Sequence, residues 1–128
     1  MKKIFTAAIL SCIFFSGCTK QDNTGIEADV SAPAIKVYYP LDVPVLPQGF
    51  PLCMKVLVTD NRNLSAVWLE INDGHGYKVD YPLTGKSIEI TEKYTATAGI
   101  SGELVAKFFA TDEAGNTSSR EIKFFMNN

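Results

Sequence analysis

From Pro33 onward, the sequence consists of short runs of β-branched and aromatic residues separated by clusters of Pro, Gly, Asn and Asp. No long segment shows the apolar spacing that an amphipathic helix needs. Short runs bounded by turn residues are typical of β-strands. The predicted strands cover residues 34–39, 52–59, 66–71, 77–83, 87–90, 93–98, 104–111 and 120–126. The sequence therefore predicts an all-β fold, and strands of this number and length favour a two-sheet sandwich.

Side chains alternate between the two faces of a strand, so the pattern of apolar residues predicts which face is buried. Lys107 marks the outer face of the run 104–111, and Lys123 and Glu70 mark it in the two runs on either side. The residues expected to point inward are Val67, Leu69, Ile71, Leu104, Ala106, Phe108, Ala110, Ile122, Phe124 and Met126. These residues are predicted to form one half of the core.

The first residues have the pattern of an exported protein. Lys2 and Lys3 precede an uncharged apolar run, residues 4–15, which is followed by Ser16, Gly17 and Cys18. This is the arrangement of a secretory signal peptide, and the run is too short to span a bilayer, which takes roughly 20 apolar residues. Residues 15–18 resemble the lipobox of bacterial lipoproteins. The resemblance implies cleavage before Cys18 and lipidation of its thiol and new amino terminus, and several acyl chains would anchor the protein firmly.

The remaining chain divides into two parts. Residues 19–32 are mostly polar, small or acidic and show no apolar period, which is typical of a flexible tether. The predicted organisation is a signal peptide at residues 1–17, a lipidated cysteine and tether at residues 18–32, and a sandwich at residues 33–128. A mature chain of this length is enough for a single domain with a modest core.

Charge and cysteine content argue against nucleic-acid binding and against a disulfide-stabilised core. The chain has 12 basic and 14 acidic side chains, and loss of Lys2 and Lys3 with the signal would raise the acidic excess to four. Such a balance does not favour binding to nucleic acid. Cys12 would leave with the signal and Cys18 would carry lipid, so Cys53 would have no partner for an intrachain disulfide. The core is therefore expected to hold without a covalent link.

Three motifs resemble those of bacterial immunoglobulin-like domains. Residues 110–118 fit the hairpin pattern A-x-D-x-x-G-N-x-S, Pro33 and Ile35 fit the usual opening, and residues 60–64 fit an Asp-Asn-x-x-Leu turn. The chain is similar to small immunoglobulin-like lipoproteins of Gram-negative bacteria, including the DUF4625-type family. This resemblance implies an immunoglobulin-like sandwich, and Thr19 after the lipidated cysteine implies sorting to the outer membrane. The resemblance to this family implies no particular activity.

The outer faces of the predicted strands carry three aromatic residues: Trp68, Phe109 and Phe125. In the immunoglobulin-like arrangement the three strands are neighbours in one sheet, with the strand of Phe109 in the middle. We therefore expect one contiguous aromatic band that binds an envelope protein or a glycan, because large apolar surface patches usually mark interactions. Two alternatives stay open: the band is buried against another subunit of an assembly, or other parts of the same domain cover it.

The sequence offers weak signals for a metal ion or catalysis. Asp112 and Asn116 carry oxygens that Ca²⁺ can accept, but both residue types also stabilise tight turns, and we favour the turn. His75 lies between two glycines and lacks partner histidines or cysteines, so a zinc site is not expected. Nucleophile-elbow, phosphate-loop and metalloprotease motifs are not found. The prediction is a non-enzymatic lipoprotein of the cell envelope without a cofactor.

Overall fold

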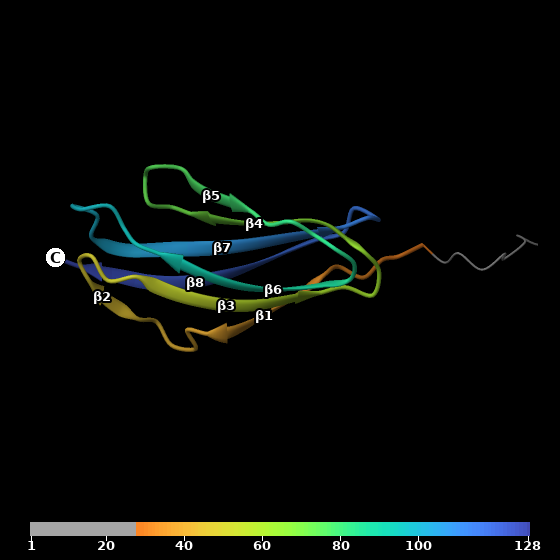
Figure 1. Cartoon of the computed structure of the whole chain (residues 1–128), viewed down its shortest axis with the longest axis horizontal. Coiled ribbons are helices and arrows are strands. Elements are labelled where there is room, and N and C mark those ends of the chain that lie inside the picture. The colour runs from red at the N-terminus through yellow and green to blue at the C-terminus, as the bar shows by residue number, and fades with distance from the viewer. Residues whose placement is uncertain (1–27) are drawn as a thin grey trace, which may run out of the picture.

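The computed structural model describes residues 28–128, which form two β-sheets stacked face to face (Figure 1). One sheet has three strands in the order β1-β3-β6, and the other has five in the order β2-β8-β7-β4-β5. The strands are β1 (Ala34–Tyr39), β2 (Val45–Pro47), β3 (Leu52–Thr59), β4 (Leu64–Ile71), β5 (Tyr77–Asp80), β6 (Ser87–Tyr94), β7 (Gly102–Asp112) and β8 (Thr117–Asn127). The predicted two-sheet β-sandwich is confirmed.

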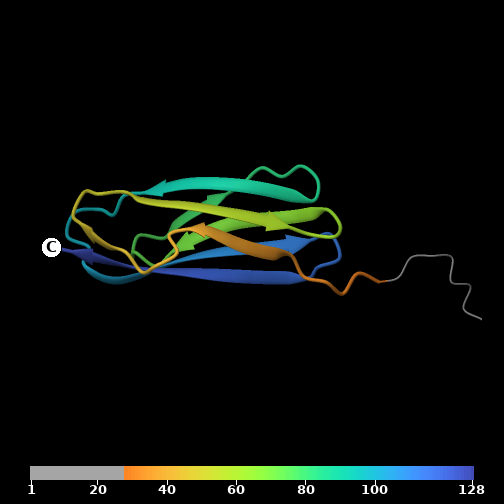
Figure 2. The same cartoon turned by 90° about the horizontal axis from the view of Figure 1, so that it is seen from below.

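The chain crosses repeatedly from one sheet to the other. After β1 the chain changes sheets, because β2 belongs to the five-stranded sheet. There β2 pairs with β8 in parallel, whereas β8 pairs with β7 in the antiparallel direction. Further crossings join β2 to β3, β3 to β4, β5 to β6 and β6 to β7. Figure 2 shows β3 between β1 and β6 in the smaller sheet. In the larger sheet β7 lies between β4 and β8, as predicted.

The core lies between the sheets, and the predicted alternation is confirmed. All ten residues expected to point inward from β4, β7 and β8 are buried, and Phe108 and Phe124 are completely so. The smaller sheet contributes Leu52, Met54, Val56, Val58, Ile90 and Tyr94. Cys53, on the opposite side of β3, is exposed and free. Apolar side chains packed from both sheets therefore hold the described part of the chain together without a disulfide.

Besides having longer β4, β7 and β8 strands, the structure differs from the predicted strands in three places. β2 lies between residues 39 and 52, where the sequence predicts no strand. It can form because Phe125 N donates to the Pro44 carbonyl at 2.9 Å, a bond that needs no donor from proline. β5 ends at Asp80, two residues before Pro82. In place of the runs 87–90 and 93–98 there is one strand, β6, which includes residues 91 and 92 and ends at Tyr94, so residues 95–98 lie outside it. All eight residues of β6 pair with β3.

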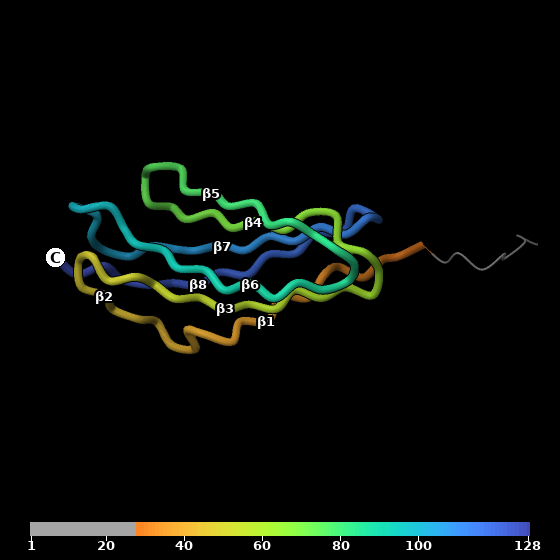
Figure 3. The backbone as a smooth tube through the Cα atoms, viewed as in Figure 1, coloured from red at the N-terminus to blue at the C-terminus, as the bar shows by residue number. Residues whose placement is uncertain are grey.

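The segment that precedes β1 meets two turns at one end of the sandwich (Figure 3). The β3–β4 and β7–β8 connections reach this end, and the C-terminus lies at the other (Figures 1 and 2). Ser118 Oγ donates to the Pro33 carbonyl at 2.6 Å, which ties the segment to β8. The described residues contain no helix long and apolar enough to cross a membrane.

Candidate cation site and outer-face aromatic pair

Three aspartates converge at the end where the chain enters the sandwich. Asp29 precedes β1, Asp60 directly follows β3, and Asp112 is the last residue of β7. Each offers a carboxylate oxygen, and these atoms all lie within 4.8 Å of one another. Asp112 is 1% exposed and is the buried charged residue of the described core. Three segments far apart in sequence thus place their acids in one cluster.

Hydrogen bonds fix the position of each carboxylate. Asp29 Oδ1 accepts from the Ser31 backbone at 3.0 Å and from the Asn61 side chain at 3.1 Å. Asp60 Oδ2 accepts from the Arg62 backbone at 3.0 Å. These donors lie within or beside the turns that carry the acids. They leave Asp29 Oδ2 and Asp60 Oδ1 buried without a hydrogen-bond partner in the described part of the chain.

Asp112 also organises the β7–β8 turn. Its Oδ1 accepts from the Asn116 backbone at 2.8 Å, and its Oδ2 accepts from the Asn116 side chain at 2.9 Å. Gly115 has a φ of 89°, which L side chains rarely adopt. Burial favours the protonated acid, but the hydrogen bonds from Asn116 and from the Ala114 backbone outweigh it, so the pKa of Asp112 lies below its usual value. The predicted turn role of Asp112 is confirmed by these hydrogen bonds.

Of the two metal-ligand candidates from the sequence, Asp112 lies in the acidic cluster and Asn116 does not. Asn116 directs its side-chain nitrogen at Asp112 and also donates to the Asp29 carbonyl at 2.9 Å, so it acts as a hydrogen-bond donor. The sequence places Asp29 in the predicted tether and Asp60 in a predicted turn, and it predicts neither as a metal ligand. The topology could have indicated both, because β3 and β7 end where β1 begins. His75 is exposed and is not part of the cluster of Asp29, Asp60 and Asp112.

Trp68 and Phe109 form a stacked pair on the outer face of the five-stranded sheet. They are directly opposite on β4 and β7, with ring centroids 4.9 Å apart and planes 8° from parallel. Lys78 Nζ lies 5.6 Å from the Trp68 ring, and Lys107 Nζ lies 5.2 Å from the Phe109 ring. Glu70 accepts a hydrogen bond from Trp68 Nε1 at 2.9 Å. Both rings are half-buried by neighbours of their own sheet.

Phe125 does not join this pair, so the predicted contiguous band is wrong. Phe109 is opposite Ser119 on β8, whereas Phe125 is opposite Glu103 near the far end of β7. Phe125 lies six positions beyond Ser119 along β8, a distance of about 20 Å in an extended strand. The intervening rows carry Lys107 opposite Glu121 and Val105 opposite Lys123. Alternation predicted the correct face for all three aromatics, but the register places Phe125 apart.

A shallow hollow of about 330 Å³ lies beside the aromatic pair. Its lining residues are Glu70, Ile71, Asn72, Val105, Lys107 and Glu121. Lys107 Nζ is 3.7 Å from Glu121 Oε1, so the hollow contains both signs of charge. The aromatic pair therefore borders a mixed polar surface, as a protein-binding patch commonly does.

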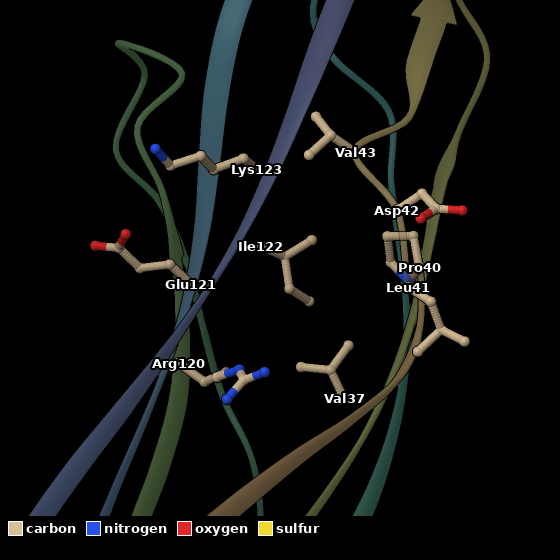
Figure 4. Close-up of a pocket in the computed structure, with 9 residues that line it drawn as sticks. All are labelled: Val37, Pro40, Leu41, Asp42, Val43, Arg120, Glu121, Ile122 and Lys123. Atoms are coloured by element: carbon tan, nitrogen blue, oxygen red, sulfur yellow. The ribbon is translucent and has the colours of Figure 1, made fainter.

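A second group of exposed apolar side chains, called the apolar strip below, comes from the connection after β1, from β2 and from β8: Leu41, Val43, Val45 and Phe125. These side chains are 83%, 53%, 64% and 38% exposed, and Val45 pairs with Phe125 across the β2–β8 ladder. A hollow of about 340 Å³ lies between this part of the chain and β8. Figure 4 shows Val37 and Ile122 projecting into it, while Glu121 and Lys123 point away.

A further polar cluster lies between β5 and β6. Glu92 accepts from the Tyr81 hydroxyl at 2.8 Å and from the Tyr77 hydroxyl at 3.3 Å. The Tyr94 hydroxyl donates to Asp73 Oδ2 at 2.9 Å. Burial, together with the adjacent carboxylates, raises the pKa of all three tyrosines above its ordinary value. These bonds join the edges of the two sheets, and we assign them a structural role.

Comparison with known proteins supports the fold and goes no further. No protein-family model matches the chain, and no curated protein matches its sequence. Among solved structures, the chain is similar to a crystallised engineered protein with a TM-score of 0.52 and 18% sequence identity. The match covers 75% of this chain, and the chain spans only 20% of the length of that protein. At this identity the likeness shows a shared β-sandwich fold alone.

Proposed function

We propose that this chain is a non-enzymatic lipoprotein of the bacterial cell envelope, anchored in the outer membrane through Cys18. In this proposal it belongs with the small immunoglobulin-like lipoproteins that its motifs resemble, and its sandwich binds another envelope protein. The signal-peptide pattern and the lipobox support export and anchoring. Both lie outside the described residues.

The observation that carries the binding role is the Trp68–Phe109 pair. The core is complete on the other face of β4 and β7, so these rings are not needed to fill it. A half-buried tryptophan beside a mixed-charge rim is characteristic of the central residues of protein interfaces. A sugar would need a free ring face to stack on. Here each ring is stacked against the other and is also approached by a lysine, which favours a protein partner over a glycan.

The apolar strip favours a second candidate function. Leu41, Val43, Val45 and Phe125 expose apolar side chains on one edge of the sandwich, although none is required in the core. Permanent interfaces are more apolar than transient ones. In this alternative the protein is a structural subunit of an outer-membrane or surface assembly, and the strip is its contact.

Paired variants distinguish the two functions. We expect Trp68→Ser with Phe109→Thr to abolish recovery of a partner in pull-downs of the tagged protein from its native envelope. Val45→Thr with Phe125→Ser makes a matched change on the same sheet and should leave recovery intact. Circular dichroism would verify that both variants fold. Loss of recovery only in the second variant would favour the structural subunit, and full recovery with both would contradict both interfaces.

The lipid anchor has its own test. We expect Cys18→Ser to prevent incorporation of a labelled fatty acid and to leave either an uncleaved precursor or a soluble form. Cys53→Ser is the matched control, because it removes an exposed thiol from the sandwich and should leave labelling unchanged. Equal labelling of the wild type and Cys18→Ser would show that the lipobox assignment is wrong.

A further inference from the structure

We propose that Asp29, Asp60 and Asp112 together bind one Ca²⁺ ion at the end of the sandwich where the chain enters. The proposal begins from their convergence: three carboxylates from three separate segments have oxygens within 4.8 Å of one another. Oxygens on opposite sides of one Ca²⁺, each at about 2.4 Å, are about 4.8 Å apart. The spacing therefore allows all three to bind the same ion.

The second observation is the lack of partners for two buried oxygens. Asp29 Oδ2 and Asp60 Oδ1 are inaccessible to solvent and accept no hydrogen bond from the described residues. An unpaired buried carboxylate oxygen is costly, because it loses water without a replacement. A bound cation would supply the missing partner to both oxygens and offset the mutual repulsion of the acids.

The surrounding donors resemble the support that metal ligands receive. Asn61 and Ser31 donate hydrogen bonds to the other oxygen of Asp29. The Arg62 backbone donates to the other oxygen of Asp60. The Asn116 backbone donates to Asp112. Such outer hydrogen bonds orient ligand carboxylates before the ion arrives. The donor set consists of hard oxygens without nitrogen or sulfur, which suits Ca²⁺ or Mg²⁺ rather than zinc. Ca²⁺ is favoured because it accepts irregular geometry, and water can complete its six to eight ligands.

Binding of Ca²⁺ would connect the segment before β1 to the sandwich. Asp29 already contacts Asn61 and Asn116, and the ion would add bonds to the ends of β3 and β7. The three segments would then unfold together rather than separately. We therefore expect Ca²⁺ to raise the thermal stability of the domain as well as to bind it.

The test uses the full chain in detergent after treatment with a chelator. Calorimetric titration with CaCl₂ should show one site with a dissociation constant of roughly 10⁻⁴ to 10⁻³ M, the range of extracellular calcium modules. Millimolar Ca²⁺ should raise the melting temperature by several degrees. Absence of both effects in the wild type would overturn the proposal. An equal shift with Mg²⁺ would overturn the assignment to calcium.

Variants separate a cation site from a purely structural cluster. Asp60→Asn and Asp29→Asn should each weaken Ca²⁺ binding by roughly tenfold or more, because each removes a charged ligand. Glu113→Gln removes an exposed acid next to Asp112 and should bind as the wild type does. With chelator present, Asp60→Asn should melt no lower than the wild type, because one repelling charge is gone. A lower melting temperature in chelator, or an unchanged Ca²⁺ response in both aspartate variants, would show that the cluster is structural only.

Discussion

Phe108→Ala is expected to destabilise the domain by about 3–5 kcal/mol. Phe108 is completely buried on β7, the middle strand of the larger sheet, with Ala106 and Ala110 on either side of it along the same face. Its removal would leave a cavity between the sheets that small neighbours cannot fill. Because the described part of the chain has no disulfide, a loss of this size is a large share of the roughly 5–15 kcal/mol that stabilises a domain.

Urea unfolding followed by circular dichroism measures this loss. Phe125→Ala removes the same side chain from a position that is 38% exposed on the outer face, so it should cost about 1 kcal/mol or less. If Phe108→Ala does not fold, Phe108→Leu keeps most of the volume and should cost less than about 2 kcal/mol. Equal losses for Phe108→Ala and Phe125→Ala would contradict the assignment of the two faces.

Strand alternation is the part of the fold that the sequence predicted well, because each face of a half-buried strand has its own chemistry. Lys107 marks the outer face of β7, and its neighbour Phe108 is then forced inward. The prediction failed where backbone pairing does not depend on side-chain type. Pro44 lacks a donor but keeps its carbonyl, and that acceptor is enough to begin the pairing of β2 with β8. A proline therefore removes one backbone donor from a strand, but its carbonyl can still accept a hydrogen bond from the neighbouring strand.

The candidate sites were harder to predict, since they depend on register and on which turns meet. Alternation placed Phe125 on the same face as Phe109, but only the pairing of β7 with β8 shows that charged rows separate them. The acidic cluster unites Asp29, Asp60 and Asp112, whose spacing along the chain carries no periodic signal. Local turn chemistry explains Asp112 by itself. Its second role becomes visible only when three segments are folded onto one end.

The edge between β5 and β6 is expected to make the domain sensitive to alkali. In the unfolded chain a tyrosine titrates near pH 10. In the folded domain the pKa values of Tyr81 and Tyr94 are raised, first by burial and then by their hydrogen bonds to Glu92 and Asp73. A raised folded pKa contributes stability that is fully present below pH 10 and is lost as the pH rises further. Each phenol that keeps its proton only in the folded state should cost about 1.4 kcal/mol per pH unit above that point.

Urea unfolding at about pH 8 and about pH 11 would show this loss, on either side of the ordinary tyrosine pKa. Lys55 must be separated from the tyrosines, because its hydrogen bond to Glu89 and the charge of Glu89 raise its pKa and act in the same direction. Tyr81→Phe with Tyr94→Phe keeps both rings and the Lys55–Glu89 pair but removes the two phenols. We expect the double variant to be less stable at about pH 8, where it lacks two hydrogen bonds, yet to lose less stability on going to alkaline pH. Ultraviolet absorbance of tyrosinate should rise when the wild type unfolds at high pH and should rise less when the variant does, because Tyr77 alone of the three tyrosines with a raised pKa remains. If both proteins lose stability equally between the two pH values, the tyrosine–carboxylate contacts are not the source of the alkaline sensitivity.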